Sequence, residues 1–582
     1  MILRDLPWRM LAVLKITGKV RWEGYRISHV PHKLFTVSKN GVAATIYDCF
    51  GYFHCRYTTA LEKYGIGSGS DREIIQHGKR HRGTFTYADL PEVTTYWRTE
   101  IGLLPDLMDR IRDAAYAGGF HIASWHGPGA LANYALRYNG VSRYHSRNLP
   151  SYVRTASRAA YCGGRFQAWM CGEYDGPVWT LDKNSAYVQA IAMLPRLDNG
   201  KWRRIDVSTI HGSGDIARFG LYHIVYNHHD NGRKRRAHGY PESPNPLFHR
   251  DKNGKLTWPS VVDGWFWSPE AMLVAGNDDA RFVEAIVYQD DGTYPFRWVE
   301  DAYATRLRLQ DPDHYSPAEK AYKWALAAIY GAFARRVGWD RKRRTAPRTH
   351  ELLWAGFITS HCRAAIYPVA RYAYDQEALI SVDTDGVMAT CPFPENLVPE
   401  GFGNGLGQWK QERFSGLLYW QNGIYWLRND DGEWKDAKSR GIPKGVIPRE
   451  AALHAMATAS FTPPYKPAKI KTTRTRFVGY RQALNAQHRN WRVWKTEPNE
   501  IVFGGTGKGL HAPPFCHVCR GGTRMKMHTI THLPPREAVS YPHKLPWLEE
   551  VPDDMEIGVI VTRDFIQAET DIWGDDDLED NL

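Results

Sequence analysis

The chain has 582 residues, of which 43% are hydrophobic, so it is long enough for several packed domains and too apolar to be generally disordered. No apolar run reaches the length of a membrane span, no secretory signal opens the chain, and the eight cysteines are scattered; these features predict a cytoplasmic protein. The net charge is +12, but residues 549–582 hold 13 acidic residues and one arginine, which leaves +24 on residues 1–548. A basic body with 22 tryptophans indicates a polyanionic partner, most simply nucleic acid, although an RNA-binding protein would share this balance.

Residues 1–120 have the pattern of a mixed α/β segment. Strand-like runs lie between residues 21 and 47, a helical run covers 51–64, and a further helix covers 96–113. The next informative stretch is Tyr-Cys-Gly-Gly-Arg, which ends at Arg165. Its glycines allow a backbone to approach a phosphate, and the arginine supplies charge, although an ordinary glycine turn explains the same residues.

An apolar strand beginning at Trp179 runs into one aspartate, Asp182, and then into a helical pattern that ends at Pro195. Residues 196–295 carry short strands, turns and a basic cluster at 233–236, which is explained equally well as a solvated turn.

Two helices are predicted over 301–310 and 317–336, and the second has good start signals in Ser316 and Pro317. Lys323 and Tyr330 are seven residues apart on this helix, so both lie on one face. An apolar helix over 354–374 follows a basic run.

The stretch Ile-Ser-Val-Asp-Thr-Asp-Gly-Val, residues 380–387, predicts two short strands joined by a tight turn. Asp383 and Asp385 crowd two carboxylates at that turn, and a hard cation such as Mg²⁺ is the usual way to hold such a pair. An acidic hairpin tip in water is the simpler alternative for these residues taken alone.

The C-terminal part is basic and aromatic. Residues 466–495 contain nine Lys or Arg and no acid, interleaved with aromatic residues, which suits a grip on nucleic acid; a solvated basic helix face is the alternative. Further on, Cys516, Cys519, His528 and His532 have the ligand types of a tetrahedral zinc site. The gap between the pairs is short and contains Gly-Gly, so two free thiols are favoured over zinc. The acidic tail is expected to be disordered.

Three of these stretches, in this order, resemble the motifs of family B DNA polymerases, which typically read D-x-x-S-L-Y-P, K-x-x-x-N-S-x-Y-G and Y-x-D-T-D-S. The residues that carry the resemblance are Asp182, Ser185 and Tyr187; Lys323, Tyr330 and Gly331; and Asp383, Thr384 and Asp385. Ala327 and Ala328 replace the family's Asn-Ser, which removes polar support near the sugar pocket. The resemblance covers most of residues 150–445, and the protein-primed branch of phages and linear plasmids fits best.

This resemblance implies roles for individual residues. The catalytic set is Asp182, Asp383 and Asp385, with two Mg²⁺ ions on Asp182 and Asp385. Nucleotide binding is assigned to Lys183, Ser185, Tyr187, Arg306, Lys320, Lys323 and Tyr330. The glycine turn resembles the family's Y-x-G-G segment, and Gly405–Glu412 and Lys438–Ile442 resemble its L-G-x-W-x-x-E strand and basic primer-contacting turn. DNA binding is therefore assigned to Tyr161, Gly163, Gly164, Arg165, Tyr425 and Lys438, although Gly423 replaces the lysine of the usual K-x-Y.

Residues 96–100 resemble the third motif of the family's proofreading exonuclease, Y-x-x-x-D, with Glu100 in place of Asp. The opening D-x-E has no counterpart, because the only acids before residue 60 are Asp5, Glu23 and Asp48. Two-metal exonuclease chemistry needs several converging carboxylates, so a partial RNase H-like remnant without proofreading activity is expected. An unrelated α/β domain is the alternative.

The implied fold is a multidomain α+β right hand with an antiparallel palm sheet, helical fingers and a small thumb. The expected parts are 1–120, exonuclease-like; 121–265, connector and first palm part with a loop insertion; 266–340, fingers; 341–445, second palm part; 446–548, basic thumb and C-terminal region; and 549–582, acidic tail.

The implied activity is DNA-directed DNA synthesis from a primer 3′-hydroxyl by two-metal-ion catalysis, in the replication of a phage or mobile element. Primer–template DNA, deoxynucleoside triphosphates and a terminal protein as primer are the expected partners of a monomer in the cytoplasm of a bacterial host. A competing class is a nucleic-acid-binding protein that has kept the fold and lost the chemistry, as Ala327, Ala328 and Gly423 suggest. A different two-metal nucleotidyltransferase would share the carboxylates but not the Lys/Tyr helix.

Overall fold

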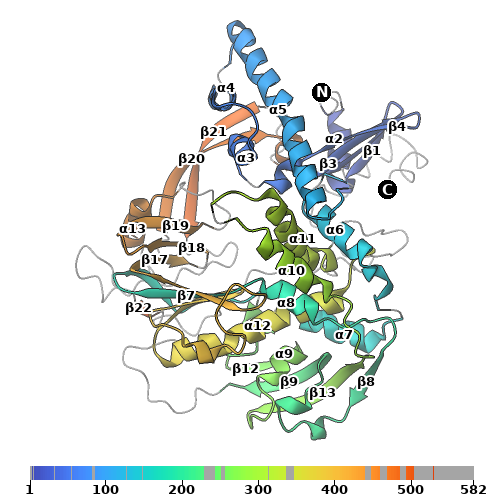
Figure 1. Ribbon diagram of the computed structural model, residues 1–582, viewed down its shortest axis with the longest axis vertical. Coiled ribbons are helices and arrows are strands. Elements are labelled where there is room, and N and C mark those ends of the chain that lie inside the picture. The colour runs from blue at the N-terminus through green and yellow to red at the C-terminus, as the bar shows by residue number, and fades with distance from the viewer. Residues whose placement is uncertain are drawn as a thin grey trace.

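The computed structural model describes residues 3, 6–31, 33–53, 55–81, 85–122, 124–125, 127–146, 148–228, 243–250, 256–311, 313–335, 347–421, 423–439, 447–458, 468–485, 493–503 and 528–529. Within these residues no helix is long and apolar enough to cross a membrane. Figure 1 shows the arrangement, with the N-terminal elements above the centre and the inserted sheet below it.

The N-terminal elements are helix α2 (Trp8–Thr17) and a four-stranded sheet with strands β1 (Lys19–Trp22), β2 (Tyr25–Val30), β3 (Leu34–Lys39) and β4 (Val42–Tyr47). The strands predicted between residues 21 and 47 are thus confirmed. They pair antiparallel in chain order, β1-β2-β3-β4. This meander contains no crossover connection, so its sheet contributes no parallel strand pair of the kind that an exonuclease-like α/β unit contains.

Helices then follow: α3 (Tyr57–Lys63), α4 (Gly69–His81), α5 (Leu90–Ala117), α6 (Gly129–Tyr138) and α7 (Ser151–Ala160). A 3₁₀ turn at Cys49–Tyr52 and α3 stand where one helix over 51–64 is expected. The two helices expected to form the fingers, called the fingers helices, are α10 (Trp298–Arg308) and α11 (Pro317–Phe333), where helices over 301–310 and 317–336 are predicted. The Ser316 side chain accepts from the Glu319 amide at 3.3 Å and caps α11. Ala321 and Ala325 of α11 pack in one core with residues of α3 and α5, so the fingers rest on the N-terminal helices.

The palm sheet has the order β16-β7-β15-β14-β5 and is antiparallel throughout. Its strands are β5 (Phe166–Ala168), β7 (Val178–Lys183), β14 (Leu379–Asp383), β15 (Gly386–Ala389) and β16 (Trp409–Phe414). Helix α8 (Ala186–Ala192) continues from β7, and α12 (Leu352–Asp375) covers the sheet. Ile366 and Val369 of α12 pack against Leu181, Val382 and Val387 of three strands, so an apolar core fixes the strand register beneath the acidic turn.

A second antiparallel sheet carries the C-terminal part, with the order β19-β18-β17-β6-β22. Its strands are β6 (Met170–Tyr174), β17 (Gly416–Gln421), β18 (Ile424–Arg428), β19 (Trp434–Ser439) and β22 (His528–Thr529). Helix α13 (Arg449–Thr458) leads to the long strands β20 (Ala468–Val478) and β21 (Val493–Phe503), with α14 (Tyr480–Asn485) following β20. The basic stretch is therefore mainly strand (Figure 1), not the helix face considered as an alternative. The Tyr480 hydroxyl lies 2.6 Å from His29 Nδ1, which ties this region to the N-terminal sheet.

The insertion forms a third antiparallel sheet, β12-β9-β13-β8, built from β8 (Lys201–Ile205), β9 (Gly220–Asn227), β12 (Val261–Trp267) and β13 (Ala280–Gln289). Helix α9 (Ser268–Met272) and the short pair β10 (His249–Arg250) and β11 (Leu256–Thr257) complete it. The expected boundary at 265/266 cuts through this sheet, because β13 pairs with both β9 and β8. The described strands between residues 201 and 289 therefore form one packed unit, and helix α10 begins after it.

Candidate active site

The three aspartates lie together at one end of the palm sheet. Asp383 ends β14 and pairs with Gly386, the first residue of β15, while Asp182 lies opposite Gly386 on the other side. The Lys183 amide donates to the Asp385 carbonyl at 2.8 Å, which joins the strand end at Asp182 to the acidic turn. Asp182 is exposed, Asp385 is half-buried and Asp383 is buried. The structure thus brings the predicted catalytic residues together on two strands, β7 and β14, and on the turn that follows β14.

Gly386 is required by the position of the Asp182 carboxylate. A Cβ atom on residue 386 would lie 2.0 Å from Asp182 Oδ1, closer than any side chain tolerates. The Asp182 side chain therefore extends across the end of the hairpin, next to Asp385. Only glycine leaves room for this carboxylate at the turn.

The donor chemistry fits magnesium that is partly held by substrate. Within the described part of the chain, no group of three or more His, Cys, Asp or Glu side chains is arranged to hold a metal ion. Mg²⁺ is commonly bound by one or two carboxylates, with waters and substrate phosphates completing its shell. Asp182 at the end of β7 and Asp385 in the neighbouring acidic turn supply such a pair of oxygen donors.

The glycine turn before β5 is packed against the acidic turn. The Thr384 amide donates to the Arg165 carbonyl at 2.8 Å. A Cβ atom on Gly164 would lie 2.8 Å from Thr384 Cγ2, so the backbone of Gly164 packs directly against the Thr384 side chain. The expectation that Arg165 contacts DNA does not agree with this structure. Its side chain is 1% exposed and donates to the Asn245 carbonyl at 2.9 Å, and burial lowers its pKa to about 9.

The other members of this turn are buried as well. Tyr161 is 1% exposed and Gly163 is buried, with its carbonyl accepting from Arg363. The side chain of Tyr161 contacts helix α11 instead, because its hydroxyl lies 3.0 Å from the Tyr330 hydroxyl. The glycine turn therefore packs against the site from the protein interior, and the Tyr161 and Arg165 side chains are not exposed to a template.

Tyr187 and Tyr330 form an edge-to-face pair beside the carboxylates. Their ring centroids are 4.8 Å apart, with an angle of 65° between the planes. Tyr187 projects from α8 just past Asp182, and Tyr330 from α11. Burial raises the pKa of both hydroxyls, so both are neutral at physiological pH. The aromatic contact expected from the two motifs is present.

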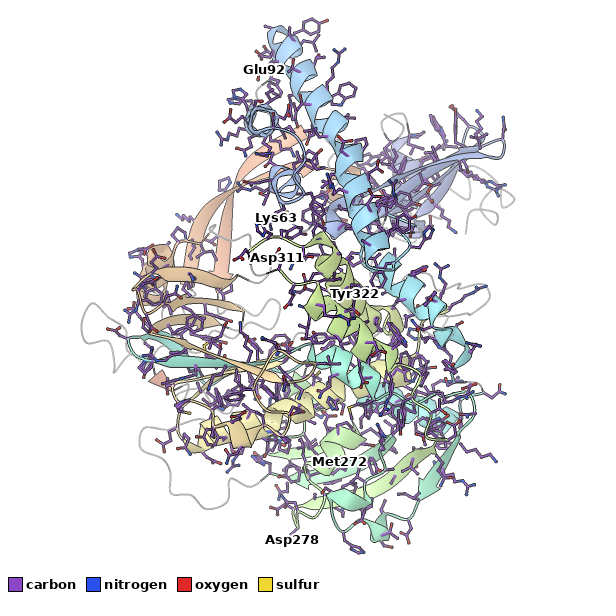
Figure 2. The ribbon with its side chains drawn as sticks, viewed as in Figure 1. Lys63, Glu92, Met272, Asp278, Asp311 and Tyr322 are labelled. Atoms are coloured by element: carbon purple, nitrogen blue, oxygen red, sulfur yellow. The ribbon has the colours of Figure 1, made fainter. Side chains whose placement is uncertain are left out.

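A cationic pocket of about 540 Å³ lies between α10 and α11. It is lined by Arg306, Leu307, Gln310, Asp311, His314, Tyr315, Ser316, Glu319, Lys320 and Lys323; Asp311 is labelled in Figure 2. Glu319 holds two of the cations, with Arg306 Nε at 2.8 Å from Oε1 and Lys320 Nζ at 2.8 Å from Oε2. Arg306 also reaches the Ser185 hydroxyl at 3.4 Å, which links the pocket to the loop after Asp182.

Lys323 stands at this pocket with an exposed side chain. Partial burial, together with the charges of Lys320 and Arg306, lowers the pKa of its ammonium group. A site that crowds three cations is stabilised by a polyanionic ligand, which removes their mutual repulsion. The pocket therefore has the electrostatics of a triphosphate site.

Lys183 does not join this pocket. Its side chain is 1% exposed and forms an ion pair with Glu400, with Nζ 2.6 Å from Oε1. The ammonium also lies 4.9 Å from the Trp409 ring centroid, and Trp409 donates to the other Glu400 oxygen at 3.3 Å. The assignment of this side chain to nucleotide binding is therefore not supported, because its charge is neutralised in the interior.

Tyr425 and Lys438 are the two remaining residues that the sequence assigns to DNA binding. Tyr425 is 6% exposed and its ring stacks on Tyr419, with centroids 5.7 Å apart and 11° between the planes, so it is a core residue here. Lys438 pairs with Tyr425 through the β19–β18 backbone, and its side chain lies outside the described residues. The same holds for Cys516, Cys519, His532, the two basic clusters and the acidic tail; of His528, only the backbone in β22 is described.

The exonuclease-like motif is part of a helix packing. Tyr96 of α5 lies over Gly78 of α4, and Glu100 forms an ion pair with Lys79 at 2.7 Å. Within the described residues, Glu100 belongs to no metal-holding group of side chains. The predicted absence of proofreading activity remains a prediction.

Sequence reasoning missed the buried acids Glu270 and Glu319 and the half-buried Glu400, each of which holds a cation near the site. Glu319 had a local signal, since it follows the capping Ser316 by three positions. Glu270 and Glu400 had none, because their partners Arg363 and Lys183 lie 93 and 217 positions away in sequence.

The arrangement of antiparallel sheets and helices around this site is a known polymerase fold. It is similar to phi29 DNA polymerase in complex with primer-template DNA, with a TM-score of 0.57 at 13% identity over 85% of this chain and 89% of that one. The ternary complex of the same polymerase with primer-template DNA and incoming nucleotide gives a TM-score of 0.55 at 14% identity, over 84% of this chain and 87% of that one. These matches confirm, at the level of the fold, the resemblance to the protein-primed polymerases of family B.

A sequence relative is a curated protein named DNA polymerase from Acidianus bottle-shaped virus (isolate Italy/Pozzuoli). It is 35% identical over 135 residues, which are 23% of this chain. The matched part of the chain spans 18% of that relative's length. No family model matches the sequence.

Proposed function

We propose that this protein is a DNA-directed DNA polymerase that adds deoxynucleotides to a primer 3′-hydroxyl. The observation that carries the proposal is the position of Asp182 at the end of β7 beside the acidic turn that holds Asp385, with the tyrosine pair beside them and the cationic pocket joined to the same loop through Ser185 and Arg306. A carboxylate pair, an aromatic pair and a cluster of cations are the groups that metal ions, a sugar and a triphosphate require.

Asp182 and Asp385 are proposed to hold two Mg²⁺ ions, with Asp383 close behind them. When bound, these ions lower the pKa of the primer hydroxyl and stabilise the negative charge that develops on the α-phosphate. The protein's own contribution is to fix the two carboxylates. Two contacts of Lys183 hold the strand end that carries Asp182. The Lys183 amide donates a hydrogen bond to the Asp385 carbonyl at 2.8 Å, and the Lys183 side chain forms an ion pair with Glu400 at 2.6 Å.

Lys323, Lys320 and Arg306 are proposed to bind the triphosphate of the incoming nucleotide. Glu319 orients two of these cations and leaves Lys323 with an exposed ammonium. Charge-assisted hydrogen bonds from such groups are among the stronger contacts available to a phosphate. Binding of the triphosphate next to the Asp182 loop would place the α-phosphate toward the carboxylates.

Tyr187 is proposed to lie beneath the deoxyribose and to exclude a 2′-hydroxyl by contact with its ring. Tyr330 supports that ring edge-to-face, and Tyr161 supports Tyr330 through a hydroxyl contact of 3.0 Å. Ala327 and Ala328 replace the polar neighbours of related sites, so weaker sugar discrimination is expected than in relatives with Asn-Ser.

Primer–template DNA is the proposed partner, since the chain outside its acidic tail carries +24. The similar phi29 DNA polymerase structures are complexes of that polymerase with primer-template DNA and with incoming nucleotide substrates. A terminal protein as primer, and a role in replicating a phage or mobile element in a bacterial host, extend the same proposal.

The test is extension of a labelled primer on a heteropolymeric template by the purified protein, with Mg²⁺ and with EDTA. The proposal predicts template-directed addition that depends on the metal.

The alternative is a polymerase-fold protein that binds nucleic acid without chemistry, which the replacements at Ala327, Ala328 and Gly423 favour. Tight primer–template binding without any extension in Mg²⁺ or Mn²⁺ would establish that alternative.

A further inference from the structure

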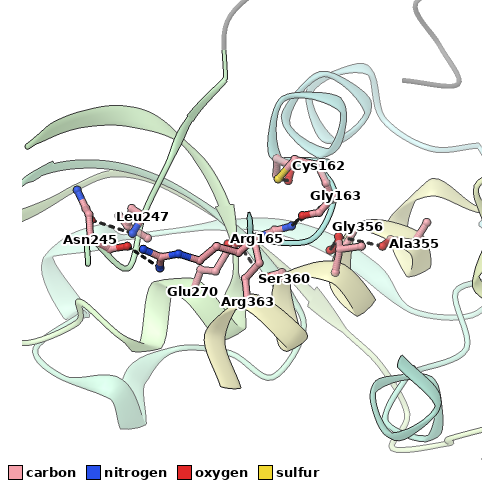
Figure 3. A network of polar contacts seen from close by, with 12 residues as sticks. Cys162, Gly163, Arg165, Asn245, Leu247, Glu270, Ala355, Gly356, Ser360 and Arg363 are labelled. Atoms are coloured by element: carbon pink, nitrogen blue, oxygen red, sulfur yellow. Dashed lines mark hydrogen bonds and ion pairs between the residues drawn. The ribbon is translucent and has the colours of Figure 1, made fainter. Parts of the chain in front are cut away.

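A buried ion pair lies behind the glycine turn. Arg363 of α12 and Glu270 of α9 are 2% and 0% exposed in their side chains, and Arg363 Nε lies 2.7 Å from Glu270 Oε1 (Figure 3). Ser360 donates to the second oxygen, Glu270 Oε2, at 2.8 Å. Such a pair costs desolvation free energy and rarely adds stability compared with apolar residues, so its presence calls for another reason.

The remaining hydrogen bonds of Arg363 supply that reason. Its Nη1 atom donates to the Cys162 carbonyl at 3.1 Å and also to the Gly163 carbonyl. One guanidinium therefore fixes two successive carbonyls of the glycine turn, and Figure 3 shows it between that turn and Glu270.

Both ends of the fixed turn contact the proposed active site. At its start, the Tyr161 hydroxyl lies 3.0 Å from that of Tyr330. At its end, Gly164 packs on Thr384, and the Arg165 carbonyl accepts from the Thr384 amide at 2.8 Å. Thr384 stands between Asp383 and Asp385, so a shift of the turn would displace the carboxylates directly.

Glu270 is also the acid that compensates for a second buried cation. Arg165 lies in the same network, donating to the Asn245 carbonyl at 2.9 Å, and the charges of Arg363 and Glu270 act on it in opposite directions. Loss of the Glu270 carboxylate would leave two buried guanidinium groups repelling each other beside the turn. Glu270 and Asn245 both belong to the inserted unit, so the insertion reaches the catalytic end of the palm through this network.

We propose that Glu270 and Arg363 are positioning residues that hold the acidic turn and the tyrosine pair in one geometry. The inference rests on the proposed polymerase function and extends it to residues that touch neither substrate nor metal. Supporting groups of this kind typically change metal affinity or activity by about 10- to 100-fold when removed.

The test compares Arg363→Met and the double variant Glu270→Leu/Arg363→Met with the wild-type protein. The double variant removes both buried charges together, which usually preserves folding. It also removes the bonds to the Cys162 and Gly163 carbonyls. We expect it to melt near the wild-type temperature and to bind primer–template equally well, while the Mg²⁺ concentration for half-maximal extension rises at least about tenfold. Arg363→Met alone is expected to be less stable, because Glu270 then loses its partner.

Glu351→Gln is the matched control. Glu351 is a buried carboxylate at the N-terminus of α12, where it accepts from the Ser146 amide and hydroxyl at 3.0 and 2.9 Å. This variant should lose stability and keep the wild-type Mg²⁺ dependence. A folded double variant with wild-type Mg²⁺ dependence would overturn the positioning role.

A second readout separates this inference from the proposed function. Mn²⁺ binding by electron paramagnetic resonance requires no catalysis, and the double variant should bind Mn²⁺ at least about tenfold more weakly than the wild type. If the wild-type protein does not extend primers, the polymerase proposal fails, and the Mn²⁺ measurement still decides the positioning role. Equal Mn²⁺ affinity in both proteins contradicts it.

Discussion

Gly164 and Thr384 are 220 positions apart in sequence, and the backbone of Gly164 packs directly against the Thr384 side chain in the acidic turn. A Cβ atom on Gly164 would lie 2.8 Å from Thr384 Cγ2, and the Thr384 amide bonds to the carbonyl of the next residue, Arg165. The glycine turn that resembles a DNA-contacting motif thus packs against the acidic turn and supports the position of its carboxylates.

Gly164→Ala should displace the acidic turn, because the new methyl group would overlap Thr384. We expect extension to fall by more than about tenfold, with a loss of stability of about 1–3 kcal/mol from overpacking. Gly102→Ala is the control, since a Cβ atom there meets no neighbour in helix α5 and should be neutral or stabilising. Steady-state extension and thermal unfolding of both variants check this, and wild-type extension by Gly164→Ala would contradict the contact.

Tyr187→Val should raise the use of ribonucleotides relative to deoxynucleotides, because the ring proposed to exclude a 2′-hydroxyl is removed. The measurement is the ratio of kcat/KM values for the two nucleotides at matched folded fractions. Tyr152→Val is a suitable control, since Tyr152 packs against the same core as Tyr187 while its hydroxyl bonds to the Trp202 carbonyl. An unchanged ratio in Tyr187→Val would remove Tyr187 from the sugar site.

The chain should have no 3′–5′ exonuclease activity of its own. Glu100, the acid of the exonuclease-like motif, is paired with Lys79 at 2.7 Å on the neighbouring helix. Degradation of single-stranded DNA in Mg²⁺ should therefore be undetectable in the wild-type protein. Glu100→Ala should cost at most about 1 kcal/mol of stability, as is usual for partly exposed pairs. Degradation that Glu100→Ala abolishes would show that the motif is active.

His361 of α12 should make the protein less stable in mild acid. Burial, aided by the nearby charge of Lys183, lowers its pKa from 6.5 to about 4. Between pH 6.5 and pH 4 the imidazole of this residue is protonated in the unfolded chain and neutral in the folded chain. The free energy of unfolding therefore decreases as the pH falls from 6.5 to 4. Complete loss of this contribution amounts to roughly 3 kcal/mol. Unfolding of His361→Gln between pH 7 and pH 4 should show a correspondingly weaker dependence; an identical dependence would contradict the shifted pKa.

The sequence predicted the elements whose signals are local. The apolar run into Asp182, the Asp-Thr-Asp turn and the helix that starts at Ser316 each depend on neighbouring residues, and all three have the predicted form. The order of these motifs then indicated the fold that the structural matches confirm.

What could not be predicted depends on contacts between distant residues. Arg165 and Lys183 were assigned to ligands because they belong to stretches that resemble the family's motifs; both are buried, since acids and carbonyls far along the chain compensate for their charge. The expected boundary at 265/266 was wrong for the same reason, because the pairing of β13 with β9 and β8 leaves no local signal in either strand.

The central claim is that Asp182 and Asp385 carry metal-dependent nucleotide addition. Single-turnover extension by Asp182→Asn tests it most directly, with Asp263→Asn, an exposed aspartate of strand β12, as the control. We predict that Asp182→Asn folds and binds primer–template but adds nucleotides at least about a thousandfold more slowly, since it loses several kcal/mol of transition-state stabilisation. Asp263→Asn should extend normally. Extension by Asp182→Asn at the wild-type rate would contradict the proposed site.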